Sequence, residues 1–164
     1  MSEIRIRDFR ADDLEAAYAL DQSCFEPGIA YTRGQIRAFL TRDGAIGLVA
    51  EKGEELVALA IADVAGRRGH LITIDIAGGE RRRGLGRRLL AEVWARMAAA
   101  GAKDVRLEVD VRNTDAIRFY EGMGFRKVRP LPDYYGLGRD GIRMTRTLAP
   151  PANPDSTKVP SSSR

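Results

Sequence analysis

Five arginines surround two glycines in the segment 81–88, and this segment limits what the chain can fold into more than any other. Its sequence is Arg-Arg-Arg-Gly-Leu-Gly-Arg-Arg, between a strand-like stretch and an amphipathic helix pattern. A helix N-terminus carries about half a positive elementary charge, so cations are unfavourable there unless an anion binds. Free N–H groups of a first helical turn bind phosphates, and glycines let a ligand approach the backbone. We therefore interpret the segment as a phosphate-binding turn.

The composition predicts one domain followed by a tail. The chain has 164 residues, 44% hydrophobic and 30% charged, with a formal net charge of +4. We assign residues 1–149 to the domain and residues 150–164, rich in Pro and Ser, to a flexible tail. The arginines are concentrated in one turn without interleaved aromatic residues, so no nucleic-acid partner is predicted.

Membrane and metal chemistry are not predicted either. No stretch approaches the roughly 18 apolar residues that span a bilayer, and residues 1–10 lack the apolar region of a signal peptide. The single cysteine, Cys24, excludes a disulfide framework and a cysteine-based zinc site, and its apolar helical surroundings favour a core position. We expect a cytoplasmic protein with no membrane partner and no metal.

Hydrophobic periodicity predicts a mixed sheet with flanking helices. Alternating residues indicate strands near residues 4–6, 46–50, 56–64, 71–77, 105–111, 125–128 and 142–148. Helical spacing and capping signals indicate helices near residues 12–24, 32–43, 85–100 and 113–122. The strand–helix–strand order around the arginine turn implies a parallel pair, whereas hairpins imply antiparallel pairs.

Two of these strands carry polar residues on one face. In the strand 71–77, Ile72, Ile74 and Ile76 are predicted to share one face, and Thr73 and Asp75 the other. In the strand 105–111, the valines and Leu107 alternate with three charged residues, Arg106, Glu108 and Asp110.

Several motifs resemble those of the Gcn5-related N-acetyltransferase superfamily. Arg81, Gly84 and Gly86 match its signature of Arg or Gln, two residues, Gly, one residue, then Gly or Ala. The second half of its acetyl-CoA site is matched by residues 107–109, 113, 116–117, 119–121 and 124–125. The likeness runs from about residue 4 to 148 and is greatest to the ribosomal-protein alanine N-acetyltransferases and their N-terminal acetyltransferase relatives. Those enzymes have a paired tyrosine in the last loop, as in Tyr134-Tyr135, although the loop 25–31 lacks their usual Pro-Trp pair.

This resemblance implies an α/β fold: a central mixed, mostly antiparallel sheet with a splayed parallel strand pair and about four flanking helices. It implies direct acetyl transfer from acetyl-CoA to a primary amine, preferably a protein or peptide N-terminal amine. A small amine such as an amino acid, polyamine or aminoglycoside is the alternative acceptor. A non-catalytic acetyl-CoA-binding sensor is the alternative of another class. Both a monomer and a homodimer are compatible with the sequence.

The resemblance also assigns the cofactor contacts. The N–H groups of residues 82–87 would bind the pyrophosphate of acetyl-CoA, and the strand 74–76 would bind the pantetheine. The N–H of Ile76 or of a residue nearby would donate to the oxyanion. The predicted acetyl-CoA-binding residues are Ile74, Asp75, Ile76, Arg81, Arg82, Arg83, Gly84, Leu85, Gly86, Arg87, Asn113, Ile117 and Tyr120.

Three residues are predicted to be catalytic. Glu108 is the candidate general base, acting directly or through a water, and Asp75 is the alternative. An α-amine with a pKa near 8 needs only a modest base. Tyr120 lies where the family has the acid that protonates the CoA sulfur, while His70 is interpreted as a surface residue. The predicted substrate contacts are Phe25, Tyr31, Glu108, Tyr134 and Tyr135.

Overall fold

A computed structural model describes residues 3–148 of the chain. The predicted tail, residues 150–164, and the predicted end of the domain at residue 149 lie outside the described residues.

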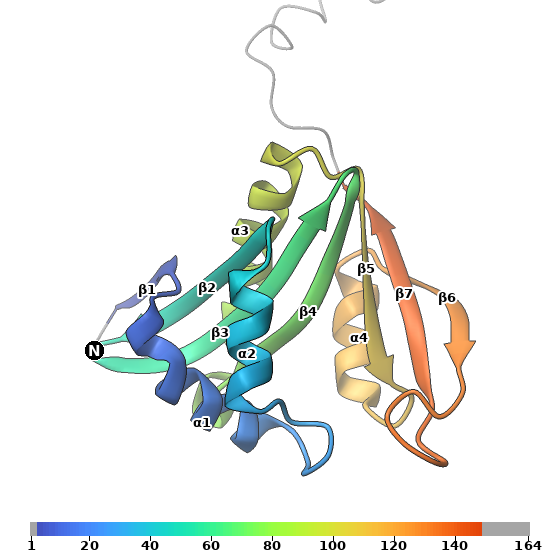
Figure 1. The fold of residues 1–164 in the computed structure, drawn as a ribbon, viewed down its shortest axis with the longest axis horizontal. Helices are drawn as coiled ribbons and strands as arrows, with labels where there is room; N and C mark the ends of the chain where they lie inside the picture. The colour runs from blue at the N-terminus through green and yellow to red at the C-terminus, as the bar shows by residue number, and fades with distance from the viewer. Residues whose placement is uncertain (1–2, 149–164) are drawn as a thin grey trace, which may run out of the picture.

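A seven-stranded mixed sheet forms the centre of the molecule (Figure 1). The strand order is β1-β2-β3-β4-β5-β7-β6, and every neighbouring pair is antiparallel except β4 and β5. The strands are β1 (Ile4–Asp8), β2 (Ala45–Lys52), β3 (Glu55–Ala65), β4 (Arg68–Ile76), β5 (Asp104–Asp110), β6 (Arg126–Leu131) and β7 (Gly141–Thr147). The predicted fold class and the single parallel pair are confirmed.

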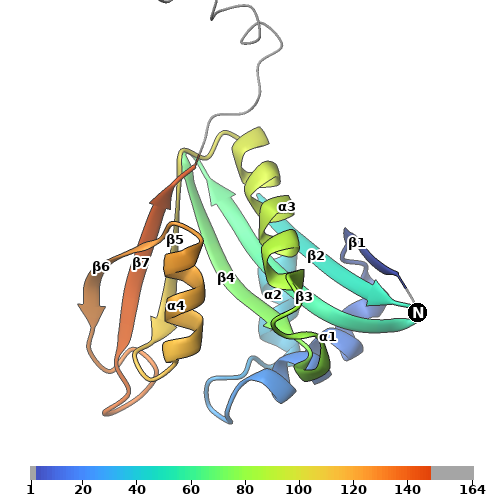
Figure 2. The same ribbon diagram turned by 180° about the vertical axis from the view of Figure 1, so that it is seen from behind.

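Two helices cover each face of the sheet (Figures 1 and 2). α1 (Leu14–Cys24) and α2 (Arg33–Thr41) lie on one face, and α3 (Leu85–Ala99) and α4 (Thr114–Gly122) lie on the other. α2 begins at the capping box expected from its sequence, because the Thr32 side chain accepts a hydrogen bond from Gln35 N and the Gln35 side chain accepts one from Thr32 N.

Each helix pair encloses its own hydrophobic core. The cluster between the sheet and α3 and α4 includes the fully buried side chains of Leu48, Leu89, Leu90, Met97, Leu107 and Met144. The cluster beneath α1 and α2 is smaller and includes Ile36, Val49, Leu59 and Ile61. Burying each such side chain stabilises the fold by about 1.5–3 kcal/mol relative to exposing it.

A bulge in β4 changes which residues face each core. Leu71 pairs with Ala62 and Thr73 pairs with Ile61, so Ile72 has no partner of its own on β3. Ile72 packs against the α1/α2 cluster, whereas Ile74 and Ile76 pack against the α3/α4 cluster. The prediction that these three isoleucines share one face is therefore wrong for Ile72, because one extra residue interrupts the alternation.

The parallel pair is splayed, as predicted. β4 and β5 pair only over Arg68–His70 and Asp104–Arg106, and beyond that point the two strands diverge (Figure 1). We call the space between the diverging parts the β4–β5 gap. Among the strands of residues 3–148, none pairs with the backbone edges that border this gap.

The strand β6 is longer than the sequence predicted. β6 continues to Leu131, through Pro130, so the loop before β7 is shorter than expected. Because β6 is the outermost strand of the sheet, a proline without an N–H fits there. Val111, predicted at the end of β5, lies one residue beyond it and is 38% exposed.

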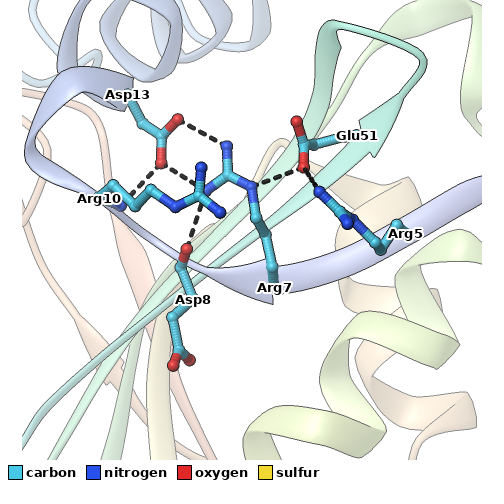
Figure 3. A network of polar contacts seen from close by, with 6 residues as sticks. All are labelled: Arg5, Arg7, Asp8, Arg10, Asp13 and Glu51. Carbon is cyan, nitrogen blue, oxygen red and sulfur yellow. Dashed lines mark hydrogen bonds and ion pairs between the residues drawn. The ribbon is translucent and has the colours of Figure 1, made fainter.

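An ion-pair network joins β1 to the start of α1 at the far end of the sheet (Figure 3). Arg7 makes two hydrogen bonds of 2.8 Å with the Asp13 carboxylate, and its Nε donates to Glu51 Oε1 at 2.6 Å. The hydrogen bond from Arg7 lowers the pKa of Asp13 more than burial raises it. The pair therefore contributes stability at neutral pH that is lost as the pH falls through the lowered pKa.

Candidate active site

The β4 edge of the gap presents free backbone N–H groups. Ala77 N donates to Val57 O at 2.9 Å, while Ile76 pairs with Ala58 and Ile74 with Ala60. Because hydrogen-bonded and non-hydrogen-bonded pairs alternate along an antiparallel ladder, the N–H groups of Ile74 and Ile76 point away from β3 and toward the gap. The Ile76 carbonyl accepts a hydrogen bond of 3.0 Å from Arg81 Nε, which ties the arginine turn to this edge.

The arginine turn places unpaired backbone N–H groups and arginine side chains at the N-terminus of α3. Arg82 and Gly84 both have left-handed backbone, with φ of 63° and 82°. In the described part of the chain, the backbone N–H groups of residues 82–87 have no hydrogen-bond acceptor, and Arg82, Arg83 and Arg87 form no ion pair. Successive free N–H groups beside guanidinium groups without an ion-pair partner have the chemistry that favours an anion.

The two glycines of the turn serve different purposes. Gly84 takes the positive φ, and a Cβ added there would meet no atom within 4 Å, so its role is conformational. A Cβ on Gly86 would lie 3.2 Å from Phe119 Cζ, so Gly86 lets α3 pack closely against α4.

α4 carries the predicted acid and the predicted cap. The Asn113 side chain accepts a hydrogen bond from Ala116 N at 3.2 Å and so caps α4. Ile117 and Tyr120 are 7% and 9% exposed, and the Tyr120 ring makes edge contacts with Phe119 and Phe125. Burial, followed by the nearby charge of Asp75, raises the pKa of Tyr120. Its hydroxyl makes no hydrogen bond with any described residue, so it is free for a ligand.

Glu108 lies on β5 just beyond the last residue that pairs with β4. Its side chain is 7% exposed, and its oxygens lie 2.7 Å from His70 Nε2, 3.3 Å from Arg143 Nε and 3.8 Å from Arg106 Nε. Burial alone would raise the pKa of Glu108, but the hydrogen bond with His70 and the charges of His70, Arg143 and Arg106 lower it overall. Glu108 is therefore a carboxylate at neutral pH.

His70 and Arg143 were not predicted to belong to this site. His70, interpreted as a surface residue, instead has a 22% exposed side chain in contact with Glu108. It reaches Glu108 because it pairs with Arg106 across the parallel strands, and Arg143 does so because it pairs with Glu108 across β5 and β7. Both residues could have been identified only from the register of the paired strands. The periodicity of residues along one strand does not give that register.

Asp75 is buried against a second carboxyl group that the sequence did not reveal. Asp75 is 1% exposed and Asp21, on α1, is fully buried. Asp75 Oδ1 accepts a hydrogen bond of 2.7 Å from Thr73 and Asp21 Oδ2 accepts one of 2.7 Å from Tyr31 N, but the other oxygen of each carboxyl group has no partner in the described chain. Burial, followed by the charge and hydrogen bond of Asp21, raises the pKa of Asp75 well above its ordinary value. A proton held on Asp75 and donated to Asp21 would give both free oxygens a partner.

Replacing Asp75 by Asn tests this shared proton. The raised pKa means that the contribution of Asp75 to stability is present below its unfolded pKa and is lost as the pH rises through its folded pKa. An amide mimics the protonated acid at every pH, so Asp75→Asn is expected to unfold at a higher temperature than the wild type at pH 8, by about 2–4 °C per kcal/mol gained. The difference should shrink toward pH 4.5. Thermal unfolding between pH 4.5 and pH 8 measures this difference in unfolding temperature. Asp43→Asn, at an exposed position, is the control. An Asp75→Asn variant less stable than the wild type at pH 8 would exclude the shared proton.

Two loops converge beside Glu108. The loop after α1 contains Phe25 and Tyr31, which are half-buried, and the loop before β7 contains Tyr134 and Tyr135, whose rings meet edge to face at 4.9 Å. Burial, with smaller effects from Asp21, Tyr134, Asp75 and Glu108, raises the pKa of Tyr31 to about 12. An ion pair of 2.8 Å between Glu26 and Arg139 joins the two loops.

The predicted base and acid lie on opposite sides of the gap. Leu107 and Val109 belong to the α3/α4 core, so Glu108 between them faces the side of α1 and α2. Tyr120 belongs to the α3/α4 core and so lies on the other side. A group held in the gap by the β4 edge can therefore be reached by a carboxylate from one face and a phenol from the other.

The described residues contain no group of three or more His, Cys, Asp or Glu side chains placed to hold a metal ion. Nor does any helix within residues 3–148 have the length and apolar character needed to cross a membrane.

A surface cavity of about 820 Å³ lies beside β1 and α3, where Glu3, Arg5, Glu51, Arg88 and Glu92 contribute to its lining. It is separated from the β4–β5 gap by three strands of the sheet.

The sequence of this chain is similar to those of known N-acetyltransferases. Residues 8–125 match the model of the Acetyltransferase (GNAT) family. The chain is 37% identical over 83 residues to an N-alpha-acetyltransferase of Sulfurisphaera tokodaii, an alignment that covers 50% of each protein. It thus spans about half the length of that relative. It is 30% identical over 142 residues to an uncharacterized N-acetyltransferase of Methanocaldococcus jannaschii, covering 86% of this chain and 90% of the relative.

The fold also resembles that of a solved enzyme. The ribosomal-protein-S18-alanine N-acetyltransferase from Escherichia coli superposes with a TM-score of 0.81 at 23% identity, over 93% of this chain and 98% of that one.

Proposed function

The chain belongs to the acetyltransferase (GNAT) family, and from that premise we propose that it transfers the acetyl group of acetyl-CoA directly to the N-terminal amine of a protein or peptide. One observation carries the proposal: free N–H groups at residues 82–87 adjoin a gap that has a carboxylate on one face and a phenol on the other. These are the parts that acetyl transfer from a thioester requires.

Acetyl-CoA is proposed to bind along the β4 edge. The N–H groups of residues 82–87 would hold its pyrophosphate, with the exposed side chains of Arg82, Arg83 and Arg87 adding charge. The N–H of Ile74 would bind the pantetheine arm, and that of Ile76 would stabilise the oxyanion. Asn113 and Ile117, at the start of α4, would contact the same cofactor.

Glu108 is the proposed base. Its lowered pKa keeps it ionised, and the two arginines that lower it also disfavour the ammonium form of an incoming amine. Asp75 is less suited, because it is 1% exposed and its raised pKa favours the protonated form. His70 would hold the Glu108 carboxylate in position.

Tyr120 is the proposed acid. The amine nitrogen attacks the thioester carbon, and its proton passes to Glu108, directly or through a water. As the tetrahedral intermediate collapses, the carbon–sulfur bond breaks and the departing sulfur takes the Tyr120 proton. Solvent then returns a proton to Tyr120 and removes one from Glu108. No covalent enzyme intermediate forms.

The peptide acceptor is supported by the relatives and by the charge of the site. The Sulfurisphaera tokodaii relative, 37% identical over half of each chain, is an N-alpha-acetyltransferase. A polyamine or aminoglycoside brings several positive charges, and the arginines beside Glu108 disfavour such a molecule.

A thiol-release assay tests the proposal directly. N-terminal peptides are compared with amino acids, polyamines and aminoglycosides at saturating acetyl-CoA. Turnover on peptides supports the proposed acceptor, whereas turnover on small amines alone replaces it with the small-molecule alternative. Tight CoA binding by calorimetry without thiol release on any amine would identify a sensor.

Replacing Gly84 by Ala tests the phosphate-binding turn. Alanine disfavours the left-handed backbone at this position by about 1–2 kcal/mol, so the free turn would leave the conformation that cofactor binding must restore. We expect acetyl-CoA to bind about tenfold more weakly in calorimetry. Gly78→Ala is the matched control, since Gly78 has no positive φ and an open surrounding, and it should change the affinity less than twofold. Equal affinities for the two variants would contradict the role of Gly84.

A further inference from the structure

Two arginines and a histidine surround the single carboxylate of Glu108. Arg106 precedes it by two residues on the same face of β5, and Arg143 lies opposite it on β7. Farther along, Arg112 and Arg139 form ion pairs with Asp110 and Glu26, so those four charges balance. Near the open end of β5 the charges thus balance around Asp110, whereas cations outnumber carboxylates around Glu108.

Arg106 is the least satisfied of these cations. Its Nε lies 3.8 Å from Glu108 Oε2, beyond hydrogen-bond distance, and this buried nitrogen has no partner in the described chain. Its guanidinium group makes no hydrogen bond with any described residue, although its side chain is 40% exposed. Among the described residues, Arg143 donates only through Nε, to Glu108 Oε2 at 3.3 Å. Both guanidinium groups thus keep N–H donors for another acceptor.

Within residues 3–148, the surface that carries these arginines is not covered by a helix. α1 and α2 cover β2–β4, and α4 lies behind β5 and β7, so no helix of residues 3–148 lies over this side of β5, β7 and β6 (Figure 1). The register adds further cations to the same face, because Arg129 pairs with Arg143 and Arg126 pairs with Thr145. We call Arg106, Arg126, Arg129 and Arg143 the arginine face.

We propose, building on the proposed peptide acceptor, that the enzyme selects N-termini whose first or second residue is acidic, and that Arg106 binds this carboxylate. A side-chain carboxylate of the first residue is only a few bonds from the α-amine, so an amine at Glu108 brings it to the adjacent guanidinium. Arginine binds carboxylates with paired, charge-assisted hydrogen bonds, which are stronger than neutral ones. Arg143 and the outer part of the arginine face favour further acidic residues downstream.

Three peptides that differ only in their first residue, Glu, Gln or Lys, test this specificity. With wild-type enzyme and saturating acetyl-CoA, kcat/KM is expected to be about tenfold higher for the Glu peptide than for the Gln peptide, and lowest for the Lys peptide. Arg106→Gln should bring the Glu-to-Gln ratio close to one, and Arg106→Glu should make Lys the preferred first residue. Arg118→Gln, an exposed change on α4, should preserve the wild-type ratio.

The outcomes separate this inference from the function on which it rests. Acetylation of all three peptides at equal rates, or a Glu-to-Gln ratio unchanged by either Arg106 variant, would overturn the acidic preference and leave the peptide acceptor intact. Transfer to free glutamate or other small amines, with none to the peptides, would overturn both. Reversal of the preference by Arg106→Glu supports direct contact, because a structural role for Arg106 would lower all three rates together.

Discussion

Replacement of Glu108 by Gln is expected to lower kcat about a hundredfold or more at pH 6.5, because general-base catalysis typically contributes about 10²–10⁴. The amide has nearly the same shape but does not take the amine proton. The acceptor must then arrive already neutral, so the loss should be greatest at low pH and should diminish toward pH 9, above the ordinary pKa of about 8 of an α-amine. Steady-state rates on an N-terminal peptide between pH 6 and 9.5 measure this shift of the profile.

The lowered pKa of Glu108 determines which group is responsible for the dependence of the rate on pH. Burial alone would raise the Glu108 pKa, but His70, Arg143 and Arg106 together lower it, so the carboxylate is already ionised at the acidic end of the measured range. The rise of the wild-type rate with pH therefore reports the acceptor amine and not Glu108. If the fall in rate at low pH disappeared in the Glu108→Gln variant, the acceptor amine would not be the group responsible for it.

Asp104→Asn is the matched control for the Glu108 variant. Asp104 lies on the same strand and face, but at the closed end where β4 and β5 still pair. Its replacement should leave both kcat and the pH profile unchanged. Because Glu108→Gln leaves Arg106 and Arg143 without their counter-charge, its fold is checked by circular dichroism and by acetyl-CoA binding. Wild-type turnover in a folded Gln variant would exclude Glu108 as the base.

The elements and the general plan of the site were predictable because they depend on local sequence. The alternation around Glu108, the capping box at Thr32 and the glycine of the arginine turn each specify a conformation over a few residues. Proline in an exposed outer strand was harder to predict, because the tolerance of Pro130 depends on the position of β6 in the sheet. The end of β6 was accordingly misplaced.

What the sequence did not reveal depends on register and on contacts between distant segments. The β4 bulge is visible only in its pairing with β3, and it reverses the side of the sheet that Ile72 faces. Asp21 lies on α1, 54 positions before Asp75, and no periodicity links the two carboxyl groups. His70 and Arg143 likewise reach Glu108 through strand pairing alone. Glu108 could therefore be predicted as the base from the sequence, but His70 and Arg143, which help to lower its pKa, were missed.

Replacement of Tyr120 by Phe is expected to lower kcat by about 10²-fold while changing the affinity for acetyl-CoA little, since only the proton donor is removed. The phenyl ring retains the contacts with Phe119 and Phe125, so stability should be preserved. Burial raises the pKa of Tyr120, and the phenol therefore stays protonated through the neutral range. The loss should consequently be uniform between pH 7 and 9, unlike that of the Glu108 variant, because no group titrates that could replace the missing acid.

Single-turnover rates and calorimetry separate these effects. The Phe variant should bind acetyl-CoA within about threefold of wild type and release thiol slowly, which distinguishes lost proton donation from lost binding. Tyr18→Phe, on α1 beneath the Arg33 guanidinium and remote from the gap, is the control and should match the wild type in both measurements. If Tyr120→Phe weakened acetyl-CoA binding as much as it slowed turnover, Tyr120 would be a packing residue and the proton for the sulfur would have to come from water in the gap.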